Sequence, residues 1–189
     1  MARTDAGRVI AGRARGIRLA GPGEGTRPIG DRVKQTLFAI LEPDLPGAAV
    51  LDLFAGSGAA GIEALSRGAT QATFVERDPA AVRVIEANLD RTHLAGPGAR
   101  VVGTDVTAWL RRPPDRPYDV VIVDPPYDDP AALVTALGAL DPFLAPGARV
   151  VAKHATGTPP PAEVGLLASE RERRFGETTL TFYRRQEER

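Results

Sequence analysis

The chain has 189 residues, of which 43% are hydrophobic, so it is long enough for one domain with a single core. It contains no cysteine, and its two histidines, His93 and His154, lie far apart in the sequence. Disulfides and thiolate metal sites are therefore excluded, and we expect no bound metal. The formal net charge is zero.

The charge is unevenly distributed along the chain. Residues 1–34 carry eight basic and three acidic side chains, whereas residues 35–169 carry ten basic and sixteen acidic ones. A basic segment of this kind is typical of one that contacts nucleic-acid phosphates. The N-terminus lacks the apolar run of a signal peptide, and nowhere do about 18 apolar residues follow one another, so we expect a cytoplasmic protein without membrane contact.

Residues 7–21, GRVIAGRARGIRLAG, alternate apolar residues with arginine around a glycine-containing turn, which predicts a β-hairpin. From Asp31 the apolar residues recur at helical spacing until Pro43, so a helix follows. We expect an arginine-rich arm over residues 1–28 and a larger domain over residues 29–189. The side chains expected to bind nucleic-acid phosphates are Arg8, Arg13, Arg15, Arg18, Arg27, Arg32 and Lys34.

From residue 49 onward, apolar stretches alternate with helix-like segments. The expected strands cover residues 49–54, 72–76, 99–103, 119–124 and 148–153. The expected helices begin near Gly58, Pro79, Val106 and Pro130. Strands that are apolar on both faces and joined by helices predict a parallel, doubly wound sheet. Residues 168–175 and 178–185 flank a turn and predict a closing antiparallel pair.

A glycine-rich loop, LDLFAGSGAAG (residues 51–61), follows the first strand of this sheet. Its glycines fit G-x-G-x-x-G at the place where a strand leads into a helix, so the backbone can approach a nucleoside ligand. Such a loop suits the pyrophosphate of NAD as well as the carboxylate of a methionine group. The candidate cofactor-binding residues here are Asp52, Phe54, Ala55, Gly56, Ser57, Gly58 and Gly61.

Glu76 ends the second strand, 20 residues after Gly56, where a carboxylate that binds ribose hydroxyls is expected. Arg77, which follows it, belongs to the same candidate site. Asp105 follows the third strand and is placed either to bind an adenine amino group, with Val106 as a wall for the ring, or to cap the next helix.

The fourth strand ends in Asp124-Pro125-Pro126-Tyr127. The prolines fix their φ angles and lack N–H groups, so the turn is rigid and offers the Asp124 carboxylate and the Pro125 carbonyl as acceptors. An exocyclic base amine has two N–H donors that these acceptors can hold, while Tyr127 offers a face for stacking. We expect Asp124, Pro125, Pro126 and Tyr127 to be catalytic, with Asp124 also contacting the cofactor.

FAGSGAAG together with VDPPY resembles the S-adenosylmethionine-dependent amino-methyltransferases. With RVIAGRARGIRL and TRPIGDRVKQTLFAIL ahead of these motifs, almost the whole chain is similar, in order, to the bacterial 16S rRNA guanine-N2 methyltransferase family. The chain departs from the family pattern at Lys153-His154, where the resemblance implies an acid.

The resemblance implies a Rossmann-like class I methyltransferase fold, with a seven-stranded, mostly parallel sheet that ends in an antiparallel hairpin. It also implies S-adenosylmethionine as methyl donor, S-adenosylhomocysteine as product, and no metal. The implied substrate is the N2 amine of a guanine in 16S rRNA, within a partly or fully assembled small ribosomal subunit, and the implied state is a monomer. The basic arm would then bind RNA.

Three alternatives remain open. A DNA adenine-N6 or cytosine-N4 methyltransferase shares the Asp-Pro-Pro-Tyr chemistry. A nicotinamide-dependent dehydrogenase would explain the glycine loop and Glu76 but not the turn at Asp124. A non-catalytic RNA-binding module would explain the arm alone.

Overall fold

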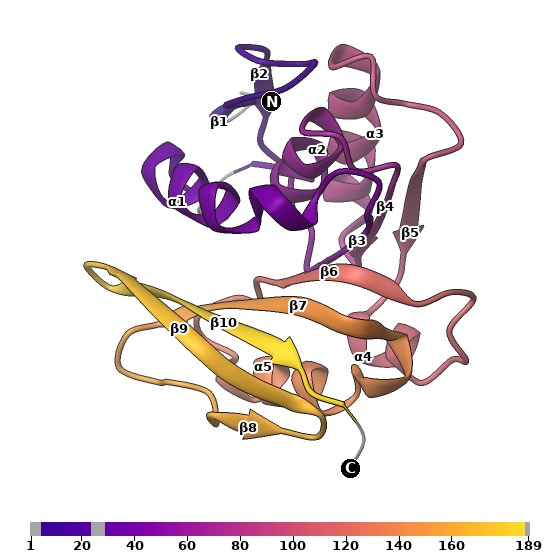
Figure 1. Cartoon of the computed structure of the whole chain (residues 1–189). Helices are drawn as coiled ribbons and strands as arrows, with labels where there is room; N and C mark the ends of the chain where they lie inside the picture. The colour runs from indigo at the N-terminus through magenta and orange to yellow at the C-terminus, as the bar shows by residue number, and fades with distance from the viewer. Residues whose placement is uncertain (1–4, 24–28, 188–189) are drawn as a thin grey trace.

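The computed structural model describes residues 5–23 and 29–187, and its central element is one eight-stranded sheet (Figure 1). Five neighbouring strands are parallel, and the other three are antiparallel to their neighbours. In spatial order the strands are β5 (Ala99–Gly103), β4 (Gln71–Glu76), β3 (Ala49–Leu53), β6 (Tyr118–Val123), β7 (Leu144–Ala155), β10 (Thr178–Arg185), β9 (Leu167–Phe175) and β8 (Glu163–Val164).

Helices cover both faces of the sheet. The side chains of α1 (Asp31–Leu41), α2 (Ala59–Ser66) and α3 (Pro79–Arg91) form one hydrophobic cluster with one face of the strands. Those of α4 (Val106–Leu110) and α5 (Pro130–Gly138) form a second cluster on the other face. A 3-10 turn, η1 (Glu42–Asp44), follows α1, and another, η2 (Asp141–Phe143), precedes β7.

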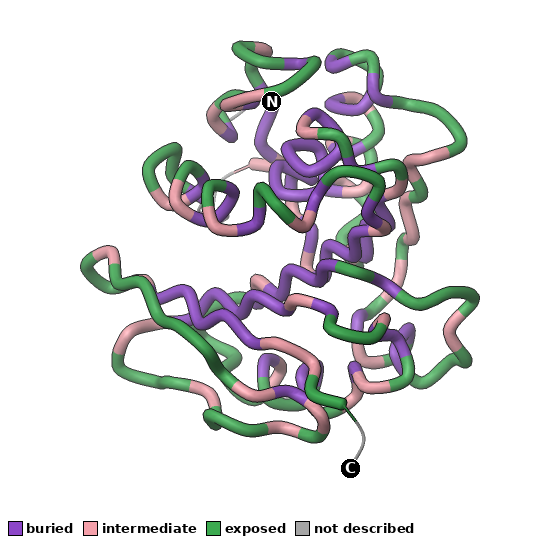
Figure 2. Tube along the Cα trace, viewed as in Figure 1, coloured by how far each residue is buried: buried purple, intermediate pink, exposed green. Residues whose placement is uncertain are grey.

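The central strands are buried on both faces, as Figure 2 shows by the purple segments that run along them. Successive side chains of a strand point to opposite faces. Ile122 of β6 therefore packs in the cluster of α1 to α3, whereas its neighbours Val121 and Val123 pack in the cluster of α4 and α5. This explains why residues 120–123 of β6 are all apolar.

The predicted α/β fold with a mostly parallel sheet and an antiparallel end is confirmed. Two details differ from the prediction. The two-residue strand β8 adds an eighth strand where seven were expected, because Glu163 and Val164 pair with the start of β9. Strand β7 begins at Leu144 instead of residue 148, because Pro146 and Gly147 lie within an irregularity of its pairing with β6.

The arm contains an antiparallel pair, β1 (Asp5–Arg8) and β2 (Arg18–Ala20), which confirms the predicted hairpin over fewer residues. Its apolar side chains, among them Val9 and Leu19, belong to the same cluster as those of α1, α2 and α3. The described part of the arm is thus packed into the main core. The expected boundary after residue 28 adjoins residues outside the described ranges and stays a prediction.

Buried polar groups of α2 fasten the arm. The carboxylate of Glu63 accepts hydrogen bonds from the backbone N–H groups of Ile10 (2.8 Å) and Ala11 (3.0 Å). The hydroxyl of Ser66 accepts one from the N–H of Ala14 (2.9 Å). Because buried backbone donors must be paired, α2 and the arm depend on each other for stability. Within the described ranges, no helix is both long and apolar enough to cross a membrane.

Candidate active site

The glycine loop and the Asp124 turn lie side by side, because β3 and β6 are adjacent and parallel. Leu53 pairs with Val123, so the two strands end at the same level. The N–H of Asp124 donates a hydrogen bond of 3.3 Å to the carbonyl of Leu53. The helices change from one face of the sheet to the other between these strands, and ligands of open α/β sheets bind at such a point.

Backbone geometry explains the glycines of the loop. Gly56 and Gly58 have φ angles of 55° and 75°, in the left-handed region that favours glycine. At Gly56 a Cβ would meet only the Phe54 carbonyl oxygen, at 4.0 Å, so the space above this residue is open. At Gly61 a Cβ would lie 2.3 Å from the Phe74 ring. The third glycine is therefore needed for close packing of α2 on β4.

Phe54 also has a positive φ angle, 60°, which is uncommon for a residue with a side chain. The neighbouring N–H of Ala55 donates to the Val75 carbonyl at 3.1 Å and ties this strained position to β4. Backbone strain of this kind gathers at functional sites, where the surrounding structure holds it in place. The loop conformation is therefore consistent with a binding role.

Asp52 lies in β3 beneath the loop and is 2% exposed. Its Oδ2 accepts a hydrogen bond of 2.9 Å from the N–H of Gly61. Burial raises the pKa of Asp52 to about 8; the Gly61 hydrogen bond opposes the increase, and the charges of Asp124 and Glu76 add to it. Three carboxyl groups thus gather at this edge of the sheet.

Glu76, at the end of β4, holds the glycine loop. Its Oε2 accepts from the N–H of Gly56 at 2.8 Å, and its Oε1 accepts from the N–H of Asp78 at 2.9 Å. An ionised carboxylate has about four acceptor positions, so Glu76 retains capacity for hydroxyl donors. The adjacent Arg77 is exposed.

Asp105 caps α4, since its Oδ1 accepts a hydrogen bond of 3.0 Å from the N–H of Ala108. The structure shows the cap, one of the two roles that the sequence predicts, while the adenine contact stays a prediction. Val106 is 3% exposed and packs in the cluster of α4 and α5. Nearly all of its side-chain surface is therefore part of the core.

The Asp124-Pro125-Pro126-Tyr127 turn meets Lys153 of β7. The Lys153 Nζ atom lies 2.6 Å from Oδ1 of Asp124 and 4.8 Å from the centre of the Tyr127 ring. The hydroxyl of Tyr127 lies 2.6 Å from Oγ1 of Thr178, at the start of β10. Side chains from β7 and β10 therefore fix the turn that follows β6. Pro125 is buried, whereas Pro126 and Tyr127 are exposed.

Asp124 and Lys153 each change the pKa of the other. Burial raises the pKa of Asp124, and the charge and hydrogen bond of Lys153 oppose this increase. Burial lowers the pKa of Lys153, but the charges and hydrogen bonds of Asp124 and, to a smaller extent, Tyr127 together raise it more, so the net shift is upward. Lys153 therefore carries its charge at neutral pH, and it counteracts the burial of the Asp124 carboxylate.

The sequence alone does not predict the partners of the turn. It marks Lys153 only as a departure from the pattern that the family resemblance implies, and nothing in it points to Thr178. His154 lies on the opposite face from Lys153, where its ring nitrogens lie 2.8 Å from the Ala155 carbonyl and 2.8 Å from the Thr181 hydroxyl.

The expected phosphate-binding residues differ in their exposure. The expectation that Lys34 binds phosphate is wrong, because its side chain is fully buried. Its ammonium donates a hydrogen bond to the Arg8 carbonyl and lies 3.8 Å from Oε2 of Glu63. Burial also lowers the pKa of Lys34. The expectation for Lys34 rests on its charge alone, and charge does not reveal that Glu63 and the arm enclose it. Arg27 lies outside the described residues.

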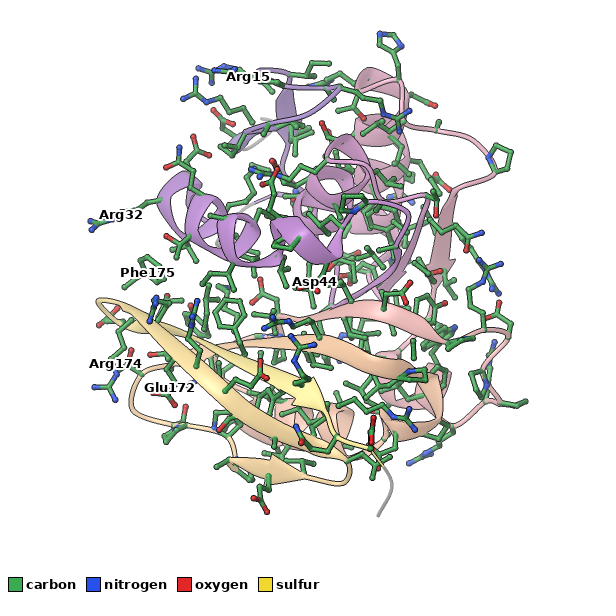
Figure 3. The ribbon with its side chains drawn as sticks, viewed as in Figure 1. Arg15, Arg32, Asp44, Glu172, Arg174 and Phe175 are labelled. Atoms are coloured by element: carbon green, nitrogen blue, oxygen red, sulfur yellow. The ribbon has the colours of Figure 1, made fainter. Side chains whose placement is uncertain are left out.

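The other candidates of this set have exposed side chains. Arg8 pairs with Asp31 at 3.5 Å, and Arg18 pairs with Asp5 at 2.6 Å. Figure 3 shows Arg15 of the arm and Arg32 of α1 projecting outward on the same side of the molecule, above the tip of the β9–β10 hairpin. The exposed set is Arg8, Arg13, Arg15, Arg18 and Arg32.

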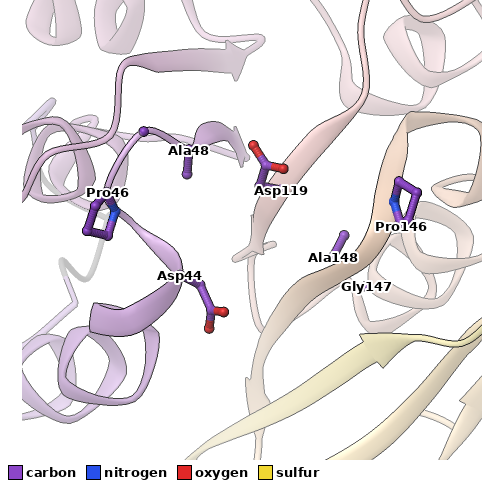
Figure 4. A pocket seen from close by; sticks show the side chains of 8 residues that line it. Asp44, Pro46, Ala48, Asp119, Pro146, Gly147 and Ala148 are labelled. Carbon is purple, nitrogen blue, oxygen red and sulfur yellow. The ribbon is translucent and has the colours of Figure 1, made fainter.

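A surface depression of about 350 Å³ lies at the opposite end of the sheet (Figure 4). Asp44, Asp119 and Gly147 are among its lining residues, and they come from the segments at the amino ends of β3, β6 and β7. The candidate site residues predicted from the sequence are not among the residues that line this depression. The carboxyl edge of the sheet, where those residues converge, therefore remains the candidate site.

The fold and the two adjacent motifs define a Rossmann-like α/β domain of the class I methyltransferase type. Among solved structures, the chain is similar to a putative methyltransferase from Escherichia coli, with a TM-score of 0.83 and 36% identity over 96% of this chain and 98% of that chain. It is also similar to a putative methylase from Haemophilus influenzae, with a TM-score of 0.81 and 32% identity over 97% and 100% of the two chains.

The family model described as "Conserved hypothetical protein 95" matches residues 7–184, so the chain belongs to this family. A Bacillus subtilis protein named "Putative rRNA methyltransferase YlbH" is 36% identical over 94% of this chain and 98% of its own length. A Haemophilus influenzae protein named "Ribosomal RNA small subunit methyltransferase D" is 43% identical over 64% of this chain. That match spans 63% of the Haemophilus protein. The predicted resemblance to the bacterial 16S rRNA methyltransferase family is confirmed.

Proposed function

We propose that this protein transfers a methyl group from S-adenosylmethionine to the exocyclic N2 amine of a guanine in 16S rRNA. The observation that carries the proposal is the position of the Asp124 turn, which lies beside the glycine loop at the end of two adjacent strands. The names of similar proteins support rRNA as the substrate class. The family resemblance supports guanine N2, a partly or fully assembled small subunit, a monomer and a cytoplasmic location.

The residues present fit S-adenosylmethionine. Open space above Gly56 allows a ligand to approach the loop backbone. Glu76 is oriented by the same loop and keeps acceptor capacity for ribose hydroxyls. When bound, S-adenosylmethionine supplies an activated methyl group, whose bond to sulfur breaks as the bond to the amine nitrogen forms.

Asp124 and the Pro125 carbonyl position the amine. Each accepts one N–H, so the nitrogen lone pair points toward the methyl donor, and the displaced proton leaves to Asp124 or to water. Good alignment of reacting groups contributes as much as about 7–11 kcal/mol to catalysis. Tyr127 stacks on the base through the ring face that Lys153 does not occupy.

The exposed arginines of the arm and of α1 bind RNA phosphates. Such contacts provide salt-dependent affinity and orient the RNA, but they read little sequence. The described part of the arm is fastened to α2, so these arginines are held in place relative to the site.

The test is transfer of a radiolabelled methyl group into naked 16S rRNA, into small subunits that lack the modification, and into duplex DNA. We expect N2-methylguanosine in RNA, detected by mass spectrometry of digested nucleosides. Asp124→Ala should abolish transfer, while Asp128→Ala, which changes an exposed acid of the same turn, serves as the matched control.

The rival functions give different results in this assay. Methyl transfer into DNA at adenine N6 or cytosine N4 would replace the proposal by a DNA methyltransferase. RNA binding without any methyl transfer would replace it by a non-catalytic RNA-binding module. Full activity of Asp124→Ala would refute the role given to the turn.

A further inference from the structure

We infer that Lys153 is a positioning residue of the methylation site, which fixes one oxygen of Asp124 and one face of Tyr127 so that the second carboxylate oxygen receives the substrate amine. The inference rests on the proposed function and concerns a residue of β7 whose side chain contacts the Asp124 turn. In this role Lys153 acts on the substrate only by holding Asp124, and it does not contact the methyl group.

The sheet places Lys153 on the same face as Asp124. Val123 of β6 pairs with Ala152 of β7, and the next residues of the two strands are Asp124 and Lys153. Because side chains alternate, Lys153 follows Val151 onto the face that also carries Ile122. Lys153 itself pairs with Leu180 of β10, so its backbone is held directly after the last pair of β7 with β6. Its position is therefore rigid.

The ammonium makes two contacts with the turn. It donates a hydrogen bond of 2.6 Å to Oδ1 of Asp124, and it lies 4.8 Å from the centre of the Tyr127 ring. The side chains of Lys153 and Asp124 are 10% and 18% exposed, so little water competes for this pair. Charge-assisted hydrogen bonds of this length are among the strongest in proteins.

The second oxygen of Asp124 is the available acceptor. Among the residues that the structure describes, none donates a hydrogen bond to Oδ2, whereas Oδ1 is taken by Lys153. The hydroxyl of Tyr127 is held by Thr178, so the ring is fixed at a second point. Lys153 thereby selects which carboxylate oxygen and which ring face meet the base.

The titratable groups around Asp124 are Lys153 on β7, Tyr127 in its own turn and Asp52 on β3. Of these, only Lys153 stabilises the ionised form of Asp124 by its charge. Loss of this charge raises the pKa of Asp124 further, because burial already favours the protonated form. A protonated carboxyl would lose acceptor capacity for the amine at low pH.

The test compares Lys153→Met, which keeps the length of the side chain but removes the charge, with Lys153→Arg, which keeps the charge. We expect Lys153→Met to lower kcat by about 10- to 100-fold, as for the loss of a charge-assisted hydrogen bond, with KM for RNA and affinity for S-adenosylmethionine little changed. The acid limb of its kcat–pH profile should move to higher pH. Lys153→Arg should restore much of both properties.

Two controls separate positioning from stability. Arg149→Met removes another cation of β7, one that lies four residues before Lys153 and pairs with Asp44 and Glu170, and should leave kcat of the folded protein unchanged. The carboxyl carbon of Asp124, followed by ¹³C NMR in the protein without RNA, should titrate at higher pH in Lys153→Met than in wild type.

The outcomes distinguish this inference from the proposed function. Wild-type protein that transfers no methyl group to any RNA would overturn the proposed function and the inference with it. Wild-type protein that methylates RNA, together with a Lys153→Met variant of equal kcat and equal pH profile, would overturn only the role of Lys153.

Discussion

The side chain of Asn88 binds the carbonyl of Ser57 in the glycine loop, with 2.9 Å between Nδ2 and the carbonyl oxygen. The same side chain also binds both backbone groups of Ala20 in the arm, each at 2.9 Å. Asn88 is fully buried in α3. One residue therefore joins the arm to the proposed cofactor loop.

Replacement of Asn88 by leucine should destabilise the protein and weaken binding of S-adenosylmethionine. The variant leaves three buried backbone groups without a partner, each at a cost of about 1–3 kcal/mol, so the free energy of unfolding should fall by at least about 3 kcal/mol. Urea unfolding and titration calorimetry measure the two effects. Asp90→Ala, an exposed position of the same helix, should change neither. A stable Asn88→Leu variant would contradict the importance of this junction.

Glu76→Gln should weaken binding of S-adenosylmethionine while leaving the fold intact. The substitution removes the charge of a carboxylate that already accepts two backbone N–H groups, and hydrogen bonds to charged groups contribute about 1.5–3 kcal/mol. We expect a dissociation constant that is higher by about 10- to 100-fold, measured by calorimetry. Glu86→Gln, an exposed glutamate of α3, is the control. Equal affinities of the two variants would exclude Glu76 as a cofactor contact.

Asp52 should make stability depend on pH. Its pKa is about 8 in the folded protein against an ordinary value of 3.8, so the folded state holds this proton more tightly than the unfolded chain. The resulting stabilisation is complete below the ordinary pKa and is lost as the pH rises toward 8. Asp52→Asn, which stays neutral, should lack this dependence.

Chemical unfolding of the wild type and of Asp52→Asn over a series of pH values measures this effect. Between pH about 5 and about 8, the wild type should lose stability relative to the variant by about 1.4 kcal/mol per pH unit. Parallel curves for the two proteins would show that Asp52 is ionised throughout this range.

The double variant Arg15→Gln, Arg32→Gln should bind RNA more weakly, without a change in affinity for S-adenosylmethionine. Both side chains are exposed on one side of the molecule, and each lost contact with single-stranded phosphate should lower the salt dependence of log K by about 0.7. Filter binding over a range of salt concentrations gives this slope. The control Arg111→Gln, Arg112→Gln changes two exposed arginines after α4. An equal slope for both variants would indicate that the RNA binds elsewhere.

Much of the fold could be predicted because its signals are local. The starts of α3, α4 and α5 at Pro79, Val106 and Pro130 agree with the expected positions. Strand β8 escaped prediction because two residues in a proline-rich segment carry no periodicity, and they form a strand only because β9 lies beside them.

The candidate site could be predicted only in part. The glycine loop, Glu76 and the Asp124 turn follow from residue type and spacing, since left-handed glycines and rigid prolines have few other uses at the ends of parallel strands. The partners of these groups depend on contacts between distant segments. Lys153, for example, lies 29 positions from Asp124 in the sequence.

The sequence by itself determined the α/β class, the order of the elements and the family, because hydrophobic period and backbone-restricted residues act over short distances. Only the tertiary structure decided which charges face solvent and which are buried. The chain has two lysines, Lys34 and Lys153. From the sequence we expect Lys34 to bind phosphate, which its burial contradicts, and we assign no role to Lys153. Their protonation and roles depend on Glu63 and Asp124, which folding brings next to them and encloses away from water.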